Sequence, residues 1–111
     1  MSRLLLTTKG PTYYSSRDES AFFGWLLDIS CVAEVAGELR SLHIRFKRQP
    51  SDKDLRELIA LFLRYRMDMR SLSIFRTAKN AGWFANDSKA FWHAKVFGKS
   101  RQTARIEIAV K

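Results

Sequence analysis

The sequence predicts an α+β fold, a single small domain in which three to four helices pack on a short antiparallel sheet or hairpin. The chain has 111 residues, of which 46% are hydrophobic, enough to fill one core but not two. Stretches with a helical spacing of apolar residues are separated by stretches in which apolar and polar residues alternate. Residues 1–111 are therefore expected to form one domain.

Residues 1–16 are expected to form an N-terminal arm or an edge strand. They contain a β-prone run, Leu4–Thr8, which is followed by the turn signal Gly10-Pro11. A helix is expected next, over residues 18–29, and either Asp18 or Ser16 can cap its start. The apolar positions that recur at helical spacing are Phe22, Trp25, Leu26 and Ile29.

The segment 31–47 has an ambiguous period in its first half, which fits either a strand or a continued helix. Its second half alternates strictly, as a half-buried strand does. The apolar residues there are Leu42, Ile44 and Phe46, and the polar ones are His43, Arg45 and Lys47. A hairpin that turns near Gly37-Glu38 is the simplest arrangement, and it exposes the polar set.

The clearest helix follows Pro50 and is expected over residues 51–66. Ser51 and Asp54 have the spacing of a capping box, with a hydroxyl at the N-cap and a carboxylate three residues later. The apolar stripe of this helix is Leu55, Leu58, Ile59, Phe62 and Tyr65.

Two further helices are expected in the last third of the chain. Asp68 can cap a helix over residues 68–81 that stops at Asn80-Ala81-Gly82. Another begins near Asp87-Ser88 and ends at Gly98. Residues 101–111 alternate in the manner of a strand, and are expected to form a C-terminal strand or tail that can pair with the N-terminal run.

The net charge is +9, and it is unevenly distributed. Residues 1–39 hold three basic residues against five acidic ones, whereas residues 40–111 hold seventeen against six. Such a field steers association with an acidic partner, which can be nucleic acid, an anionic membrane or an acidic protein.

Membrane, metal and cofactor chemistry find no support in the sequence. The longest apolar stretch, Ala21–Ile29, is far shorter than the roughly 20 residues that span a bilayer. The start of the chain lacks the pattern of a secretory signal, so the protein is expected in the cytoplasm. One cysteine and two histidines give no spacing for a metal site, and there is no glycine-rich phosphate loop.

Catalytic groups are sparse, and the chain is not expected to be an enzyme. Cys31 can act with His43 or His93 only if the fold brings them together, and a buried thiol is more often a packing residue. His93 is better explained as a structural hydrogen-bond donor. The acidic residues Asp18, Asp54, Asp68 and Asp87 fall at helix starts, where they need no acid–base role.

Binding to an acidic surface is thus the expected activity, and two kinds of partner compete. For a protein partner, arginine and aromatic residues are the usual hot spots of an interface. The residues expected to bind it are Arg45, Lys47, Arg64, Arg66 and Arg70. For nucleic acid, the same cations would neutralise phosphates, and the pair 51–66 and 68–81 has helix-turn-helix lengths, although the aromatic residues fall at core spacing rather than as a stacking surface.

The segment 54–98 resembles a known class of proteins. The residues that carry the resemblance are Asp54, Leu55, Leu58, Ile59, Leu61, Phe62, Tyr65, Asp68, Met69, Leu72, Phe75, Trp83, Phe84, Phe91, Trp92, His93, Val96, Phe97 and Gly98. It is similar to small bacterial immunity proteins of the contact-dependent growth inhibition type, which are encoded beside polymorphic toxins. The resemblance implies a non-enzymatic cytoplasmic antidote that blocks the active site or substrate access of a cognate toxin, and it places no binding residues.

This chain departs from that class in its charge. Antidotes to nuclease toxins are commonly acidic, whereas this chain carries +9. Electrostatic complementarity therefore predicts a toxin with an acidic patch, such as a carboxylate-rich or metal-binding active site, or binding away from the substrate cleft.

Overall fold

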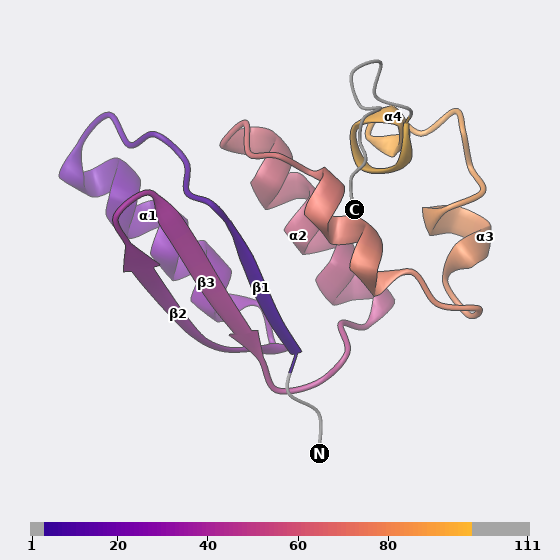
Figure 1. Ribbon diagram of the computed structural model, residues 1–111, viewed down its shortest axis with the longest axis horizontal. Coiled ribbons are helices and arrows are strands. Elements are labelled where there is room, and N and C mark those ends of the chain that lie inside the picture. The colour runs from indigo at the N-terminus through magenta and orange to yellow at the C-terminus, as the bar shows by residue number, and fades with distance from the viewer. Residues whose placement is uncertain (1–3, 99–111) are drawn as a thin grey trace.

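A computed structural model describes residues 4–98 of the protein. The segments in which apolar and polar residues alternate form a three-stranded sheet. The three strands are β1 (Leu4–Lys9), β2 (Val32–Glu38) and β3 (Ser41–Phe46), paired antiparallel in the order β1-β3-β2. The helices are α1 (Ser16–Asp28), α2 (Asp52–Arg64), α3 (Ala81–Phe84), α4 (His93–Phe97) and the 3-10 helix η1 (Arg70–Phe75) (Figure 1). The predicted α+β class is confirmed. The strand or tail expected at 101–111 lies outside the described residues.

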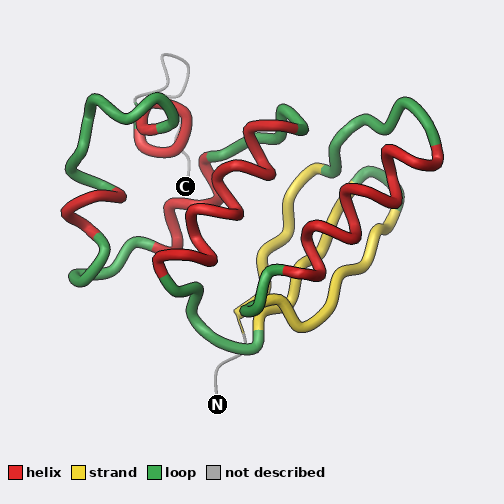
Figure 2. The backbone as a smooth tube through the Cα atoms, turned by 180° about the vertical axis from the view of Figure 1, so that it is seen from behind, coloured by secondary structure: helices red, strands yellow, loops and turns green. Residues whose placement is uncertain are grey.

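One face of the sheet is buried and the other is open. The buried face presents Leu6, Val32, Leu42, Ile44 and Phe46, each at most 4% exposed. Helix α1 lies across this face (Figure 2), and side chains of α1 and α2 join the same core. The open face carries His43 and Arg45, as the alternation in the sequence predicted.

Helix α1 begins two residues before the predicted position. Its N-cap is Ser15, whose hydroxyl accepts a hydrogen bond from the amide of Asp18 at 3.1 Å, so the predicted caps Asp18 and Ser16 are wrong. Asp18 lies instead in the first helical turn, where the helix dipole favours a carboxylate. There it accepts the backbone N–H of Tyr14 at 3.0 Å.

The hairpin turns at Leu39-Arg40, not at the predicted Gly37-Glu38. Glu38 pairs with Ser41, and this register sets Val35 opposite Ile44 on the buried face. A turn two residues earlier would place Val35 opposite Arg40, so burial selects the observed register. A bulge between Val32 and Glu34 gives the core-facing residues a helix-like spacing, which explains the ambiguous period of this segment.

Helix α2 confirms the predicted capping box at Ser51 and Asp54, although it ends at Arg64, two residues short of the predicted end. Asp54 also accepts hydrogen bonds from the guanidinium of Arg48 and the hydroxyl of Ser30, both at 2.8 Å. This network ties the start of α2 to the segments that flank β2 and β3. The predicted stripe faces the core, with Leu61 added to it.

The predicted helix over residues 68–81 is wrong. Residues 70–75 of this segment form the 3-10 helix η1 instead, although the Asp68 carboxylate accepts the amide of Arg70, the first residue of η1, at 3.0 Å. Met69, Leu72 and Phe75 are buried as expected, but they are spaced by three residues, which is the period of a 3-10 helix. Asn80 then fixes the chain by donating to the carbonyl of Phe75 at 2.9 Å.

The last predicted helix is also shorter than expected. Asp87 accepts the amide of Lys89 at 3.2 Å in a turn, and α4 begins only at His93. Two aromatic rings fix this region, because Phe84 and Trp92 pack at 5.7 Å between centroids. The short helix α3 supplies Phe84 to that contact.

Candidate partner-binding site

The five cations expected to bind a partner do not form one surface. Arg45 lies opposite Leu5, near the end of β3, and Lys47 follows that strand. Arg64 and Arg66 lie where α2 ends, and they share a pocket with Lys9, which pairs with Ser41 at the other end of the sheet. Four residues of strand, roughly 13 Å, therefore separate the Arg45 region from the end that holds Lys9.

Two of the five cations are bound to carboxylates within the chain. Arg45 forms an ion pair with Glu34 across the strands. Arg70 binds Asp68 with two parallel hydrogen bonds, of 3.0 and 2.8 Å, and these bonds lower the pKa of Asp68. Both pairs are exposed, so a partner carboxylate that replaced Glu34 or Asp68 would have to overcome only about 1 kcal/mol or less.

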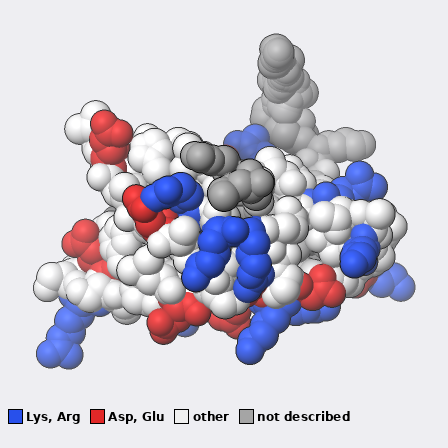
Figure 3. All heavy atoms as spheres, turned by 90° about the horizontal axis from the view of Figure 1, so that it is seen from below, with Lys and Arg blue, Asp and Glu red and all other residues white. Residues whose placement is uncertain are grey.

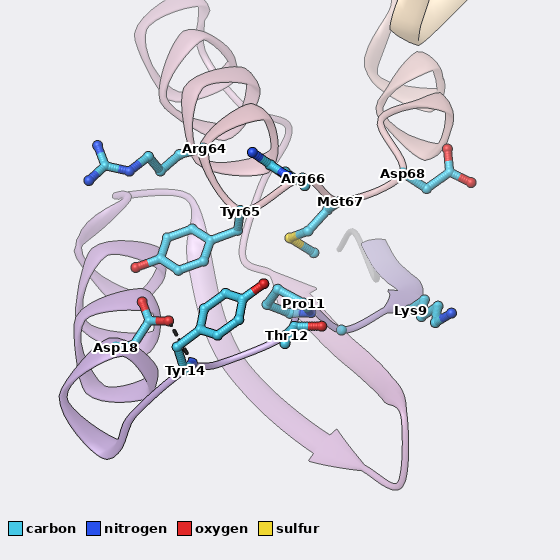
Figure 4. A pocket seen from close by; sticks show the side chains of 11 residues that line it. Lys9, Pro11, Thr12, Tyr14, Asp18, Arg64, Tyr65, Arg66, Met67 and Asp68 are labelled. Atoms are coloured by element: carbon cyan, nitrogen blue, oxygen red, sulfur yellow. Dashed lines mark hydrogen bonds between the residues drawn. The ribbon is translucent and has the colours of Figure 1, made fainter.

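Lys9, Arg64 and Arg66 take part in none of the ion pairs found within residues 4–98. They line one shallow pocket of about 500 Å³. Figure 4 shows the rings of Tyr14 and Tyr65 between Arg64 and Lys9, with Arg66 above them. We call Lys9, Tyr14, Arg64, Tyr65 and Arg66 the basic pocket.

The two tyrosines of the basic pocket differ in how firmly they are held. Tyr14 is 87% exposed. The ring of Tyr65 packs edge-on against the buried Phe22, with 4.9 Å between centroids. Burial, followed by the nearby carboxylate of Asp18, raises the pKa of Tyr65, so its hydroxyl stays protonated and can donate a hydrogen bond at neutral pH.

Arg66 occupies a position where glycine is the usual residue. The amide of Arg66 bonds to the carbonyl of Leu63 at 3.1 Å, and that of Met67 to the carbonyl of Phe62 at 2.9 Å. This is the Schellman ending of a helix, and its C′ residue adopts a left-handed conformation. Arg66 has φ 56°, which an L-residue other than glycine adopts at an energetic cost.

Two carboxylates also line this pocket, and both already have donors. Asp68 is bound to Arg70, and Asp18 accepts the amide of Tyr14. The pocket thus combines three cations and two phenol groups with two carboxylates that donors of this chain already contact. Such a set of planar guanidinium, ammonium and phenol groups matches a carboxylate or a phosphate.

The cysteine and histidines singled out in the sequence are not assembled into a catalytic group. Cys31 is fully buried, and burial followed by the Asp54 carboxylate raises its pKa to about 12. The thiol is thus protonated at neutral pH and is a weak nucleophile. The Nε2 atom of His93 lies 2.7 Å from the carbonyl oxygen of Ala85, which agrees with the predicted structural role.

A row of polar side chains crosses the open face of the sheet. Nδ1 of His43 lies 3.0 Å from the Thr7 hydroxyl, and its Nε2 lies 3.4 Å from a carboxylate oxygen of Glu38. Hydroxyl, imidazole and carboxylate in this order are known from hydrolases. Neither Thr7 nor His43 lines the basic pocket or the two other pockets formed by residues 9–42 and 25–57.

Within residues 4–98, no group of three or more His, Cys, Asp or Glu side chains is placed to hold a metal ion. None of the helices in that same range is long and apolar enough to cross a membrane. Viewed from below, the surface carries Lys and Arg in separate groups with Asp and Glu between them (Figure 3). The net charge is therefore not gathered on the face seen there.

Comparisons with protein-family models, with curated proteins and with solved structures found no match to this chain.

Three members of the basic pocket were not predicted as binding residues: Lys9, Tyr14 and Tyr65, the last of which was expected only in the apolar stripe of α2. Lys9 and Tyr14 belong to the segment expected to be an arm or edge strand, and nothing local marks them as neighbours of α2. The signal for Lys9 was its place just before the Gly10-Pro11 turn, at the end of a strand. The backbone conformation of Arg66 had no sequence signal, because glycine is the residue that normally announces it.

Proposed function

We propose that this protein is a binding protein without enzymatic activity that recognises a carboxylate-bearing surface of another protein through the basic pocket. One observation carries the proposal. Lys9, Arg64 and Arg66 come from two distant segments, line one pocket together with two tyrosines, and take no part in the ion pairs of residues 4–98. Arginine and tyrosine are enriched at the residues that dominate binding energy in interfaces.

Stabilisation of helix α2 explains the presence of Arg64 in the basic pocket but not that of Arg66. A cation at Arg64, in the last turn, is favoured by the helix dipole. Arg66 has no such explanation, because glycine would relieve the left-handed backbone at the same place. Residues in unfavourable backbone conformations cluster at functional sites, which supports a binding role for Arg66.

Within the class of binding proteins, we propose a bacterial immunity protein of the contact-dependent growth inhibition type, acting in the cytoplasm. Its partner would be a toxin domain with an acidic surface, whose active site or substrate access it blocks. The support is the resemblance over residues 54–98, the net charge of +9, and the buried, protonated thiol of Cys31.

The direct test uses the polypeptide encoded by the gene next to that of this protein. The two purified chains are mixed and run on a sizing column at low and at physiological salt. A single peak that contains both chains, and loss of the neighbour's toxicity in cells that express this protein, are expected. Separate elution of the two chains at both salt concentrations contradicts the proposal.

Nucleic acid is the second candidate, since the same cations would bind phosphates. The helix-turn-helix reading is weakened because the second segment is the 3-10 helix η1 rather than an α-helix. Fluorescence anisotropy with a labelled 20-base DNA and RNA decides the matter. Tight binding whose logarithm falls linearly with the logarithm of salt would replace the protein partner with nucleic acid.

A further inference from the structure

The tip of the hairpin between β2 and β3 carries a leucine that packing does not explain. Leu39 is completely exposed, at 101%, and its φ is 57°. It is the first of two turn residues, where glycine or asparagine is the usual choice. Because Leu39 is exposed, its side chain adds no hydrophobic stabilisation to the core of this protein. Its left-handed backbone conformation also carries an energetic cost.

The same unfavourable backbone occurs at one other residue of the described chain, and the two belong to adjoining pockets. Leu39 and Arg66 are the non-glycine residues with positive φ among residues 4–98. Leu39 lines a second pocket of about 650 Å³. This pocket shares Lys9 with the basic pocket, and Gly10, Pro11 and Thr12 line both pockets as well. Figure 1 shows the hairpin tip beside the β1–α1 segment.

This end of the molecule therefore combines an apolar projection with cations. Arg40 follows Leu39 in the turn and takes part in none of the ion pairs within residues 4–98. The half-buried rings of Tyr13 and Phe23 line the second pocket behind the leucine. An apolar centre with charged groups around it is the usual anatomy of a protein interface.

We propose that Leu39 is the apolar anchor of the partner interface and inserts into an apolar pocket on the partner protein, whose rim carries carboxylates for Lys9, Arg40 and Arg66. This inference rests on the proposed function, and it adds that the partner's surface has an apolar pocket beside its carboxylates. A protein fits better than an anionic bilayer because Glu38 precedes Leu39 and Glu19 lines the same pocket. A uniformly acidic lipid surface would repel both carboxylates, whereas a protein can place its carboxylates beside the cations and away from Glu19 and Glu38.

The test replaces Leu39 with glycine, which suits the backbone. Binding to the neighbouring gene's polypeptide is measured by isothermal titration calorimetry for wild type, Leu39→Gly and Leu27→Ala. Leu27 is an exposed leucine (51%) in the last turn of α1, so it controls for loss of any surface leucine. Leu39→Gly is expected to weaken binding about ten-fold or more with an unchanged or higher melting temperature, and Leu27→Ala to bind within about two-fold of wild type.

The outcomes separate this inference from the proposed function. If Leu39→Gly binds as wild type does while Arg66→Gly binds weakly, the anchor is wrong and the basic pocket stands. If wild type binds neither the polypeptide nor any acidic protein domain encoded beside it, both proposals fall. Binding of wild type to phosphatidylcholine–phosphatidylserine vesicles that Leu39→Gly abolishes would also overturn the anchor, because the occupant would then be a membrane.

Discussion

At the scale of single residues, two backbone positions are the best indicators of the candidate binding surface. Leu39 and Arg66 have φ of 57° and 56°, where sequence and local structure disagree about the best residue. Natural sequences are mostly consistent across levels, and exceptions gather at functional sites. For both residues, glycine serves as a substitution that removes the side chain without harming the backbone.

Arg66→Gly should separate binding from folding. Glycine relieves the left-handed conformation, so the free energy of unfolding is expected to stay the same or rise by up to about 1 kcal/mol. Affinity for the acidic partner should fall about ten-fold, since a guanidinium that binds carboxylate is removed. Urea unfolding and calorimetric titration measure the two quantities. A clear loss of stability would show that the Arg66 side chain supports the fold instead.

Cys31 should be chemically inert in the folded protein. Its thiol is fully buried, and its pKa of about 12 leaves almost no thiolate at pH 8. A disulfide reagent such as Ellman's is therefore expected to label Cys31 only after denaturant unfolds the chain. Fast labelling of the native protein at pH 8 would revive a role for this thiol as a nucleophile.

At the scale of elements, a partly buried network of hydrogen bonds around Asp54 fixes the start of α2. Burial by itself raises the pKa of Asp54, but hydrogen bonds from the Ser51 backbone and from the side chains of Ser30, Arg48 and Ser51 together lower it from 3.8 to about 2. The Asp54 side chain is 6% exposed. The charged carboxylate is thus favoured by the folded state, by about 2 kcal/mol.

Asp54→Asn is expected to lower the free energy of unfolding by about 2 kcal/mol at pH 7. Because the folded pKa is below the unfolded one, the contribution of Asp54 is complete above about pH 4 and is lost as pH falls toward 2. Thermal unfolding between pH 2 and 7 should show the two proteins converge at the acid end. Asp52→Asn, in the same first turn but exposed, is the control; an equal loss there would assign the effect to the helix dipole.

The elements show how far local sequence patterns reach. Alternation and the capping box correctly predicted β3 and the start of α2, because both depend on neighbours in sequence. The helix over residues 68–81 failed because burial of Met69, Leu72 and Phe75 is satisfied by a 3-10 turn as well as by an α-helix. The turn position failed since pairing of Val35 with Ile44 outweighed the local preference of Gly37 for a turn.

The candidate site could be predicted only in part for a similar reason. Arg64 and Arg66 were singled out because they adjoin in sequence at a helix end. Lys9 joins them only through the tertiary packing of the β1–α1 segment against α2. The sequence did not indicate that Arg45 and Arg70 would pair with carboxylates of the same chain, Glu34 across the sheet and Asp68 two residues away.

At the scale of the whole molecule, the net charge and the position of the binding site affect different steps of binding. A net charge of +9 raises the rate of encounter with any acidic partner. Replacing any one cation is expected to lower this rate by a similar amount. A local contact affects the complex itself and hence mainly its dissociation. Two variants that change the net charge equally at opposite ends of the sheet therefore distinguish a general field from a defined site.

Arg66→Glu and Lys47→Glu form that pair, because each turns one exposed cation into a carboxylate. Arg66 lies in the basic pocket, and Lys47 follows β3 at the other end of the sheet. Calorimetric titration of the neighbouring gene's polypeptide at physiological salt is expected to show at least about ten-fold weaker binding for Arg66→Glu and at most about two-fold for Lys47→Glu. Equal loss of affinity in the two variants, or a larger loss for Lys47→Glu, would contradict the basic pocket as the partner-binding site.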